Sequence, residues 1–324
     1  MSVGSLHMLL AHAGEFSIKP SQVYLSGGTL TLRVPLGVTT ISAVAIGGGG
    51  GGGGGASMPT NADYYGQGGA GGGGGGLSYG TFAVTPEELL TVIVGAGGIG
   101  GHTSSYGTFG GFSYIKRGST NLLAASGGVP GQGGTGSSGD SVKPGGAGGG
   151  GNAGTEADGG GNGGTGGDSS YGQGTGGGGA GGYSGNGGDG GGLGHSDGSN
   201  GVGGGSGGGA QGGQGNSTPY TTSKWTGHRG GSTKVLGEGS SGAGGDYDDQ
   251  YAYGMGGSAN IAPEFNYHYG GGGGGGGNGA GKNSSGFQFM ARSFGSSGIS
   301  GAVRLIWGDG TSVREYPTTN TEDV

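Results

Sequence analysis

The stretch VTTISAVAI-GGGGGGGGG, residues 38–55, decides the fold of this chain. Its first nine residues are rich in β-branched side chains, which favours a β-strand. Its last nine residues are all glycine, and they have no side chain to bury. A strand that runs directly into pure glycine predicts a β-domain from which a glycine-rich element emerges.

The composition of the whole chain extends this contrast. Glycine supplies 107 of the 324 residues, whereas Leu, Ile, Val and Phe together number 47, about 15% of the chain and below the roughly 20% of ordinary globular domains. This excludes a conventional enzyme with a continuous aliphatic core. Collagen is excluded as well, because it needs glycine at every third position and abundant proline, and this chain has nine prolines.

The aliphatic residues gather toward both ends of the chain. Residues 1–126 hold 30 of the 47, residues 127–285 hold 8, and residues 286–324 hold 9. We therefore expect one β-domain, built from residues 28–126 together with 286–324. A glycine-rich insert would occupy 127–285, and residues 1–27 would form an N-terminal attachment segment.

The pattern of the two ends is typical of short strands. In GTLTLRV, residues 28–34, apolar and polar side chains alternate, which predicts a half-buried strand. Seven or eight short strands without a convincing helix predict an all-β fold, an antiparallel β-sandwich of jelly-roll type. The expected strands are 28–34, 38–46, 89–94, 112–117, 122–125, 287–292 and 302–307.

The glycine-rich segments allow two interpretations. One is a flexible linker. The other is a bundle of polyglycine II helices, extended and left-handed with three residues per turn, in which each N–H donates sideways to a neighbouring helix. Close packing then requires glycine wherever two helices touch. Residues 47–55, 71–76 and 270–277 are pure glycine and would be the innermost helices.

Charge and targeting signals exclude several classes of partner. The net charge is −7, with 12 scattered basic residues, so we expect no nucleic-acid binding. The chain has no cysteine, hence no disulfide and no thiolate metal site. Neither a signal peptide nor an apolar run long enough for a membrane span is recognisable.

Motifs that resemble chemistry are explained by the abundance of glycine. GLSYG around Ser78 and GHSDG around Ser196 match the nucleophile-elbow pattern, but neither lies between a clear strand and helix. A P-loop spacing ends at Lys282 with Asn283 in place of Ser or Thr. We expect no enzymatic activity, cofactor or metal; a weak Ca²⁺ candidate at Asp246, Asp248 and Asp249 fits a solvated acidic loop better.

Aromatic residues between the glycine runs are the candidate binding residues. Tyr, Ser, Gly and Asn with occasional Trp and Arg make up adaptable binding surfaces. The alternative is that these rings cap the ends of a glycine bundle. The candidates for receptor contact are Tyr64, Tyr65, Tyr220, Trp225, Arg229, Tyr247, Tyr251, Tyr253, Phe265, Tyr267 and Tyr269.

Several of these segments resemble the glycine-rich domain of phage tail-fibre and tail-tip proteins. The resemblance is carried by VPLGVTTISAVAIGGGG from Val34, GTFAVTPEELLTVIVGAGG from Gly80 and LLAASGG from Leu122. The ending GAVRLIWG, followed by YPTTNT, is similar to the C-terminus of glycine-rich structural proteins of marine and cyanobacterial phages. At Glu87 that family more often has glycine, which leaves the type of this turn open.

The resemblance implies a β-sandwich that carries inserted polyglycine helices. A similar arrangement occurs in the extracellular glycine-rich region of the anaplastic lymphoma kinase receptor. Adhesins of T-even-like phages display receptor-binding loops on a polyglycine sandwich. The chain is therefore expected to be a tail-fibre or tail-tip adhesin, made in the host cytoplasm and carried on the virion, that binds a host glycan or outer-membrane protein. The alternative is a capsid decoration protein or a fibre subunit, and a homotrimer is one assembly that fits either function.

Overall fold

The computed structural model describes residues 21–25, 27–56, 67–135, 142–169, 174–192, 230, 233, 269–272, 280–282, 288–290, 294–308 and 313–321. This part of the chain is all-β, with antiparallel sheets and without an α-helix. Its strands are β1 (Ser21–Leu25), β2 (Gly28–Arg33), β3 (Thr40–Ile46), β4 (Leu77–Ala83), β5 (Leu89–Val94), β6 (Ser113–Arg117), β7 (Thr120–Ala125), β8 (Ala280–Lys282), β9 (Gln288–Met290) and β10 (Ala302–Trp307).

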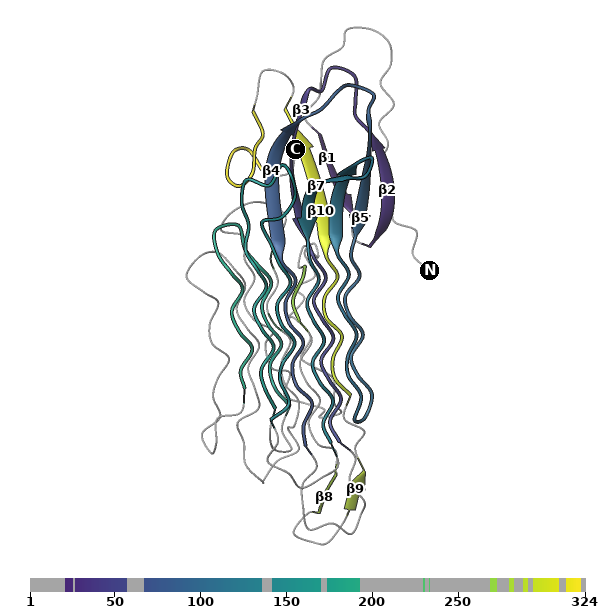
Figure 1. Cartoon of the computed structure of the whole chain (residues 1–324), viewed down its shortest axis with the longest axis vertical. Coiled ribbons are helices and arrows are strands. Elements are labelled where there is room, and N and C mark those ends of the chain that lie inside the picture. Colours follow the sequence, from purple (N-terminus) through teal and green to yellow (C-terminus); the bar gives the residue numbers. More distant parts are fainter. Residues whose placement is uncertain are drawn as a thin grey trace.

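Eight of these strands form two four-stranded sheets. One sheet has the order β1-β10-β3-β4 and the other the order β2-β5-β6-β7, and every pair is antiparallel. The two sheets lie at one end of the molecule, and β8 and β9 lie at the other end (Figure 1). Glycine-rich segments run between the two ends.

Strand β3 is buried on both of its faces. Alternate residues of a strand face opposite sides of the sheet, and both sides of β3 are covered. Ile41 and Ala43 belong to a core shared with residues of the second sheet, whereas Val44 and Ile46 belong to a second cluster with Tyr316 of the C-terminal segment. Six of the seven β3 residues are therefore buried.

Most of the expected strands are present, but four elements differ from the expectation: β1, β4, β8 and β9. β1 lies in the presumed attachment segment, and it pairs with β10 as an edge strand of the first sheet. β4 was not expected as a strand, because its sequence LSYGTFA contains an interior glycine that weakens strand propensity. β9 falls in the expected strand 287–292, but it pairs with β8 in a separate two-stranded sheet and does not return to the main sheets.

The glycine-rich segment 47–56, which continues β3, is hydrogen-bonded to neighbouring glycine-rich segments. Within residues 47–56, every third N–H donates to the same neighbouring segment. Gly47, Gly50 and Gly53 donate to the carbonyls of Gly76, Gly73 and Ala70 at 2.8–2.9 Å. The N–H groups of residues 48, 51 and 54 donate to the carbonyls of residues 111, 108 and 105. The N–H groups of Gly49 and Gly52 donate to the carbonyls of Ile299 and Ser296. The donors thus rotate among three neighbours with a period of three residues.

Residues 47–56 are surrounded by neighbouring segments on all sides. They also accept hydrogen bonds from residues 98, 101 and 104 and from residues 128, 131 and 134, again at every third position. Gly49 closely approaches the carbonyl of Gly271. The neighbours are therefore 67–76, 95–104, 105–111, 127–134, 270–272 and 294–300. Two of the three pure-glycine runs expected to be innermost, 47–55 and 71–76, are completely buried, as are the described residues 270–272 of the third.

Close approach of these backbones explains why the inner segments are glycine. A Cβ added at Gly50 or Gly51 would lie under 3.0 Å from a carbonyl oxygen of an adjacent segment, a distance that real Cβ atoms essentially never show. The same holds at Gly73 and Gly74 in the neighbouring segment. Side chains are therefore excluded from the interior of the bundle, which fits the expectation drawn from the pure glycine runs.

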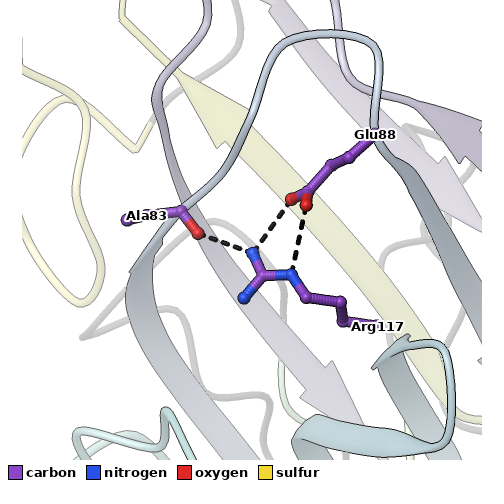
Figure 2. Close-up of polar contacts among 3 residues, drawn as sticks. All are labelled: Ala83, Glu88 and Arg117. Atoms are coloured by element: carbon purple, nitrogen blue, oxygen red, sulfur yellow. Dashed lines mark hydrogen bonds and ion pairs between the residues drawn. The ribbon is translucent and has the colours of Figure 1, made fainter.

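The turn between β4 and β5 is held by an ion pair that reaches the second sheet. Figure 2 shows Arg117 of β6 directed at Glu88, with Nη2 2.9 Å from Oε1 and Nε 3.2 Å from Oε2. The same Nη2 donates to the carbonyl of Ala83 at 2.6 Å. In this turn Glu87 has φ 69°, a left-handed conformation that favours glycine. This conformation explains why the family that this segment resembles more often has glycine at the position of Glu87.

Candidate binding surface

The outer segments of the glycine bundle expose one residue in three. In residues 161–168, Asn162, Thr165 and Asp168 are exposed, whereas glycines between them pack inward. Residues 186 and 189 follow the same pattern on the adjacent segment. Because the period is three, exposed side chains stack in a row along one side of each segment. The surface of the bundle therefore consists of parallel rows of side chains.

Rows on one side of the bundle are polar, and their side chains complete the backbone hydrogen bonding. Oδ1 of Asn186 accepts from the N–H of Asn162 at 2.9 Å, and Oδ1 of Asp189 accepts from the N–H of Thr165 at 2.8 Å. Oδ1 of Asp168 likewise accepts from a glycine N–H at 2.9 Å. Each of these side chains thus satisfies a backbone N–H group of the adjacent glycine-rich segment.

A second row is aromatic. Tyr106, Phe109 and Phe112 are spaced by three residues on the outer segment 105–112, and they are exposed by 60%, 69% and 48%. We call these three residues the aromatic ladder. Phe112 stacks on Tyr114 of β6, with ring centroids 5.7 Å apart and an interplanar angle of 10°, so the row continues onto the second sheet. The ammonium of Lys116 lies 4.6 Å from the centre of the Tyr114 ring.

Apolar neighbours widen the aromatic ladder. Ile99, on the adjacent segment 95–104, is 65% exposed, and its segment is joined to the ladder segment by the hydrogen bond from the Thr108 N–H to the Ile99 carbonyl. Phe294 is 37% exposed and contacts His102 edge-on at 5.0 Å between ring centroids. Large exposed apolar side chains thus gather on three consecutive segments of the bundle.

The residues expected to contact a receptor lie almost entirely outside the described part of the chain. This applies to Tyr64, Tyr65, Tyr220, Trp225, Arg229, Tyr247, Tyr251, Tyr253, Phe265 and Tyr267, and to the weak Ca²⁺ candidates Asp246, Asp248 and Asp249. The assignment of these residues stays a prediction.

Tyr269 is the one candidate that the structure describes. Its side chain is 8% exposed and packs in the second core cluster with Ile46 and Ala302. Its backbone exchanges two hydrogen bonds with Thr233, at 3.0 and 3.1 Å. Most of the ring is therefore occupied by packing within this cluster.

The serine of the first nucleophile-like motif has a structural environment. Ser78 lies on β4 and is completely buried. Its Oγ donates to the carbonyl of Ala124 and accepts from the N–H of Ala153 at 3.0 Å. The hydroxyl thus joins β4 to β7 and to the segment that follows residue 152. The other such serine, Ser196, lies outside the described residues.

One hollow on the polar side of the bundle has a volume of about 360 Å³. Its lining is mainly glycine backbone, with Val142, Thr165 and Ser169, and its single titratable side chain is Asp168. Within the described ranges, no three His, Cys, Asp or Glu residues lie close enough to hold a metal ion. The same part of the chain contains no helix that could span a membrane.

The sequence carries a signal for the aromatic ladder. YGTFGGF, residues 106–112, places aromatic residues at every third position and small residues between them. The strand pattern predicts only Phe112, as the first residue of 112–117, and gives Tyr106 and Phe109 no role. The period of three identifies all three rings as one row.

The comparison with protein families agrees with this architecture. No curated protein shows a significant match to the chain. A family model described as a glycine-rich domain matches residues 25–246, which is more than half of the chain. The chain therefore belongs to the glycine-rich domain family.

Proposed function

We propose that this chain is a non-enzymatic phage virion protein, a tail-fibre or tail-tip adhesin in which a rigid glycine bundle carries a binding surface away from an anchoring β-domain. The resemblance of the strand segments to phage tail proteins suggests the setting. The observation that carries the proposal is the three-residue cycle of hydrogen bonds around residues 47–56. A flexible linker does not account for this cycle.

We infer that the glycine segments are polyglycine II helices and that the two sheets form a sandwich of jelly-roll type. Three residues per turn would send successive N–H groups toward three different neighbours, as the donors of residues 47–56 do. Six surrounding segments fit the hexagonal packing of such helices. The core shared by residues of both sheets supports face-to-face packing of the sandwich.

The bundle would act as a spacer. Residues 47–56 leave β3 and residues 67–76 return to β4, and the N–H of Ala56 donates to the carbonyl of Gln67 at 2.8 Å. At about 3.1 Å per residue, ten residues extend about 30 Å. Ala56 and Gln67, the described residues on either side of 57–66, therefore lie at the end of the bundle remote from the sheets; the candidates Tyr64 and Tyr65 fall between them in the sequence. A host glycan or an outer-membrane protein would be the partner, with other tail proteins at the β-domain.

The second candidate is a virion structural protein without a receptor role, either a capsid decoration protein or a fibre subunit. The packing of Tyr269 favours it, because this candidate residue lies in a core cluster instead of on the surface. If the remaining aromatic candidates pack in the same way, they cap the bundle and bind no receptor.

Immunogold electron microscopy of particles from the source of this chain separates these functions. Label at the tail fibre or tail tip is expected for an adhesin, whereas label over the capsid would indicate decoration. Particles without label would overturn the virion assignment. As a second step, the variant Trp225→Ala/Tyr251→Ala/Tyr267→Ala should lose cell binding while it keeps the thermal transition of the wild type. Undiminished cell binding would refute the assignment of these residues.

A further inference from the structure

We infer that the aromatic ladder is a binding platform for an extended polysaccharide chain. The ladder consists of Tyr106, Phe109 and Phe112 on the side of the bundle, and none of these three residues is among the receptor-contact candidates named from the sequence. This inference rests on the proposed function for the choice of a cell-surface glycan, and it names a ligand class and a site for it.

Exposure of the ladder is the first argument. The ladder rings are exposed by about half or more, and Ile99 and Phe294 extend the same apolar surface. Single exposed apolar side chains are common, but a contiguous exposed patch marks a site of interaction. Aromatic rings also bury a large area with few rotatable bonds, so they bind at a low cost in conformational entropy.

The spacing of the rings fits a sugar chain. Segment 105–111 is held to residues 48–54 at every third position, so its extended backbone is fixed. At about 3.1 Å per residue, rings three residues apart stand about 9 Å apart. This is close to the length of one disaccharide unit of an extended polysaccharide, so alternate sugars would meet successive rings. The apolar C–H face of a pyranose stacks on the face of an aromatic ring, because the negative face of the ring attracts the C–H groups.

Polar groups beside the rings suit hydroxyl-rich ligands. Within the described contacts, the backbone N–H groups of Tyr106 and Phe109 donate to no protein acceptor. They are therefore available to sugar hydroxyls. Lys116 adds an ammonium at the end of the row near the sheets.

Charge distribution agrees with a neutral or acidic glycan. Residues 95–112 and the described segment 294–301 contain no Asp or Glu. By contrast, residues 142–192 carry Glu156, Asp158, Asp168 and Asp189. The ladder side therefore does not repel the carboxylates of acidic sugars, whereas the polar side would.

Another glycine segment is a poor occupant for this surface. Inside the bundle, adjacent segments approach so closely that even a Cβ would clash with a neighbouring carbonyl. Rings at positions 106, 109 and 112 therefore keep a glycine segment of a second copy from extending the bundle here. Ring-to-ring packing between two copies is the competing outcome, and the experiment separates it from glycan binding.

The test is retention of the purified full chain on insoluble cellulose, chitin and calcium alginate beads, together with affinity electrophoresis in soluble hydroxyethylcellulose. The wild type is expected to bind at least one of these polysaccharides. The variant Tyr106→Ala/Phe109→Ala/Phe112→Ala should lose at least about tenfold in affinity, since aromatic anchors dominate such interfaces. Phe109→Trp should keep binding, because it keeps a stacking ring.

Val142→Ala is the matched control. Val142 is 57% exposed, but it lies on the polar side of the bundle, so its loss should leave polysaccharide binding unchanged. If the triple variant does not fold, Phe109→Ala alone, at the most exposed ring, should still weaken binding measurably.

Three results would overturn the inference. They are a wild type that binds none of these polysaccharides, a folded triple variant that binds like the wild type, and a wild-type oligomer in sedimentation velocity that the triple variant loses. The proposed function fails in a different way. If the chain binds polysaccharide through the ladder but immunogold labelling finds it on no phage particle, the binding platform is supported and the adhesin function is refuted.

Discussion

A single methyl group inside the glycine bundle tests the packing most directly. Gly50 lies in the innermost segment, where an added Cβ would come under 3.0 Å from the carbonyl oxygen of Val129. That carbonyl accepts the N–H of Gly73 at 2.9 Å. In Gly50→Ala the segment 127–134 therefore has to move away from residues 47–56.

The cost of this movement follows from the hydrogen bonds that it disturbs. The affected bonds are Gly73 to Val129, Gly128 to Gly48 and Gly131 to Gly51, each 2.9 Å long. At about 1 kcal/mol net for each hydrogen bond, we expect Gly50→Ala to lower the free energy of unfolding by about 2–4 kcal/mol. Overpacking of a well-filled interior costs a similar amount, about 1–3 kcal/mol.

Gly150→Ala is the control at an exposed position of the bundle. The nearest atom to its added Cβ would be Oγ of Ser126 at 3.7 Å, an ordinary contact. This substitution should be neutral or stabilise the protein by about 0.4–1 kcal/mol, because alanine restricts the unfolded chain.

Differential scanning calorimetry of the two variants and the wild type provides the measurement. At about 2–4 °C per kcal/mol, Gly50→Ala should lower the midpoint by about 4–16 °C, and Gly150→Ala should not lower it. Equal midpoints for both variants would refute the packed bundle, since glycines in a flexible linker tolerate alanine equally at either position.

Three further substitutions test the β-domain. Glu87→Gly should raise the free energy of unfolding by up to about 1 kcal/mol in chemical denaturation, because it relieves a left-handed φ of 69° that costs an L-residue about 1–2 kcal/mol. The entropy of glycine and the loss of the exposed pair with Arg33 offset part of this gain. Glu88→Gln should lower it by about 0.5–1 kcal/mol at low salt and by less in about 1 M NaCl, because the partly exposed pair with Arg117 is screened. Tyr316→Phe should lower it by about 1–3 kcal/mol, because the hydroxyl that accepts from Nη1 of the buried Arg304 is lost.

Two of these substitutions, Tyr316→Phe and Glu88→Gln, have an internal comparison. Tyr106→Phe removes a hydroxyl from an exposed ring and should change stability by less than about 0.5 kcal/mol. Arg33→Gln breaks the more exposed pair with Glu87 and should cost less than Glu88→Gln. A stabilising Tyr316→Phe, a destabilising Glu87→Gly or a salt-independent effect of Glu88→Gln would each contradict the corresponding argument.

The sequence by itself predicted the features that depend on side-chain chemistry. Alternation of apolar and polar residues predicted β2, and the stretch 38–46, rich in β-branched residues, predicted β3. Two pure-glycine runs predicted the segments that lie innermost, because only glycine permits backbones to approach so closely. These features follow from local patterns that remain visible in one dimension.

Tertiary structure decided how the segments are arranged. Glycine segments have no side chains that could specify a partner, so their neighbours follow from the sheets that they continue: residues 47–56 extend β3, 95–104 extend β5, and 126–134 extend β7. Pairing over long sequence distances, such as that of β1 with β10, is likewise invisible in a local pattern. The position of Tyr269 in a core and of the aromatic ladder on the surface depends on which segments surround each residue, and therefore only the folded chain determines it.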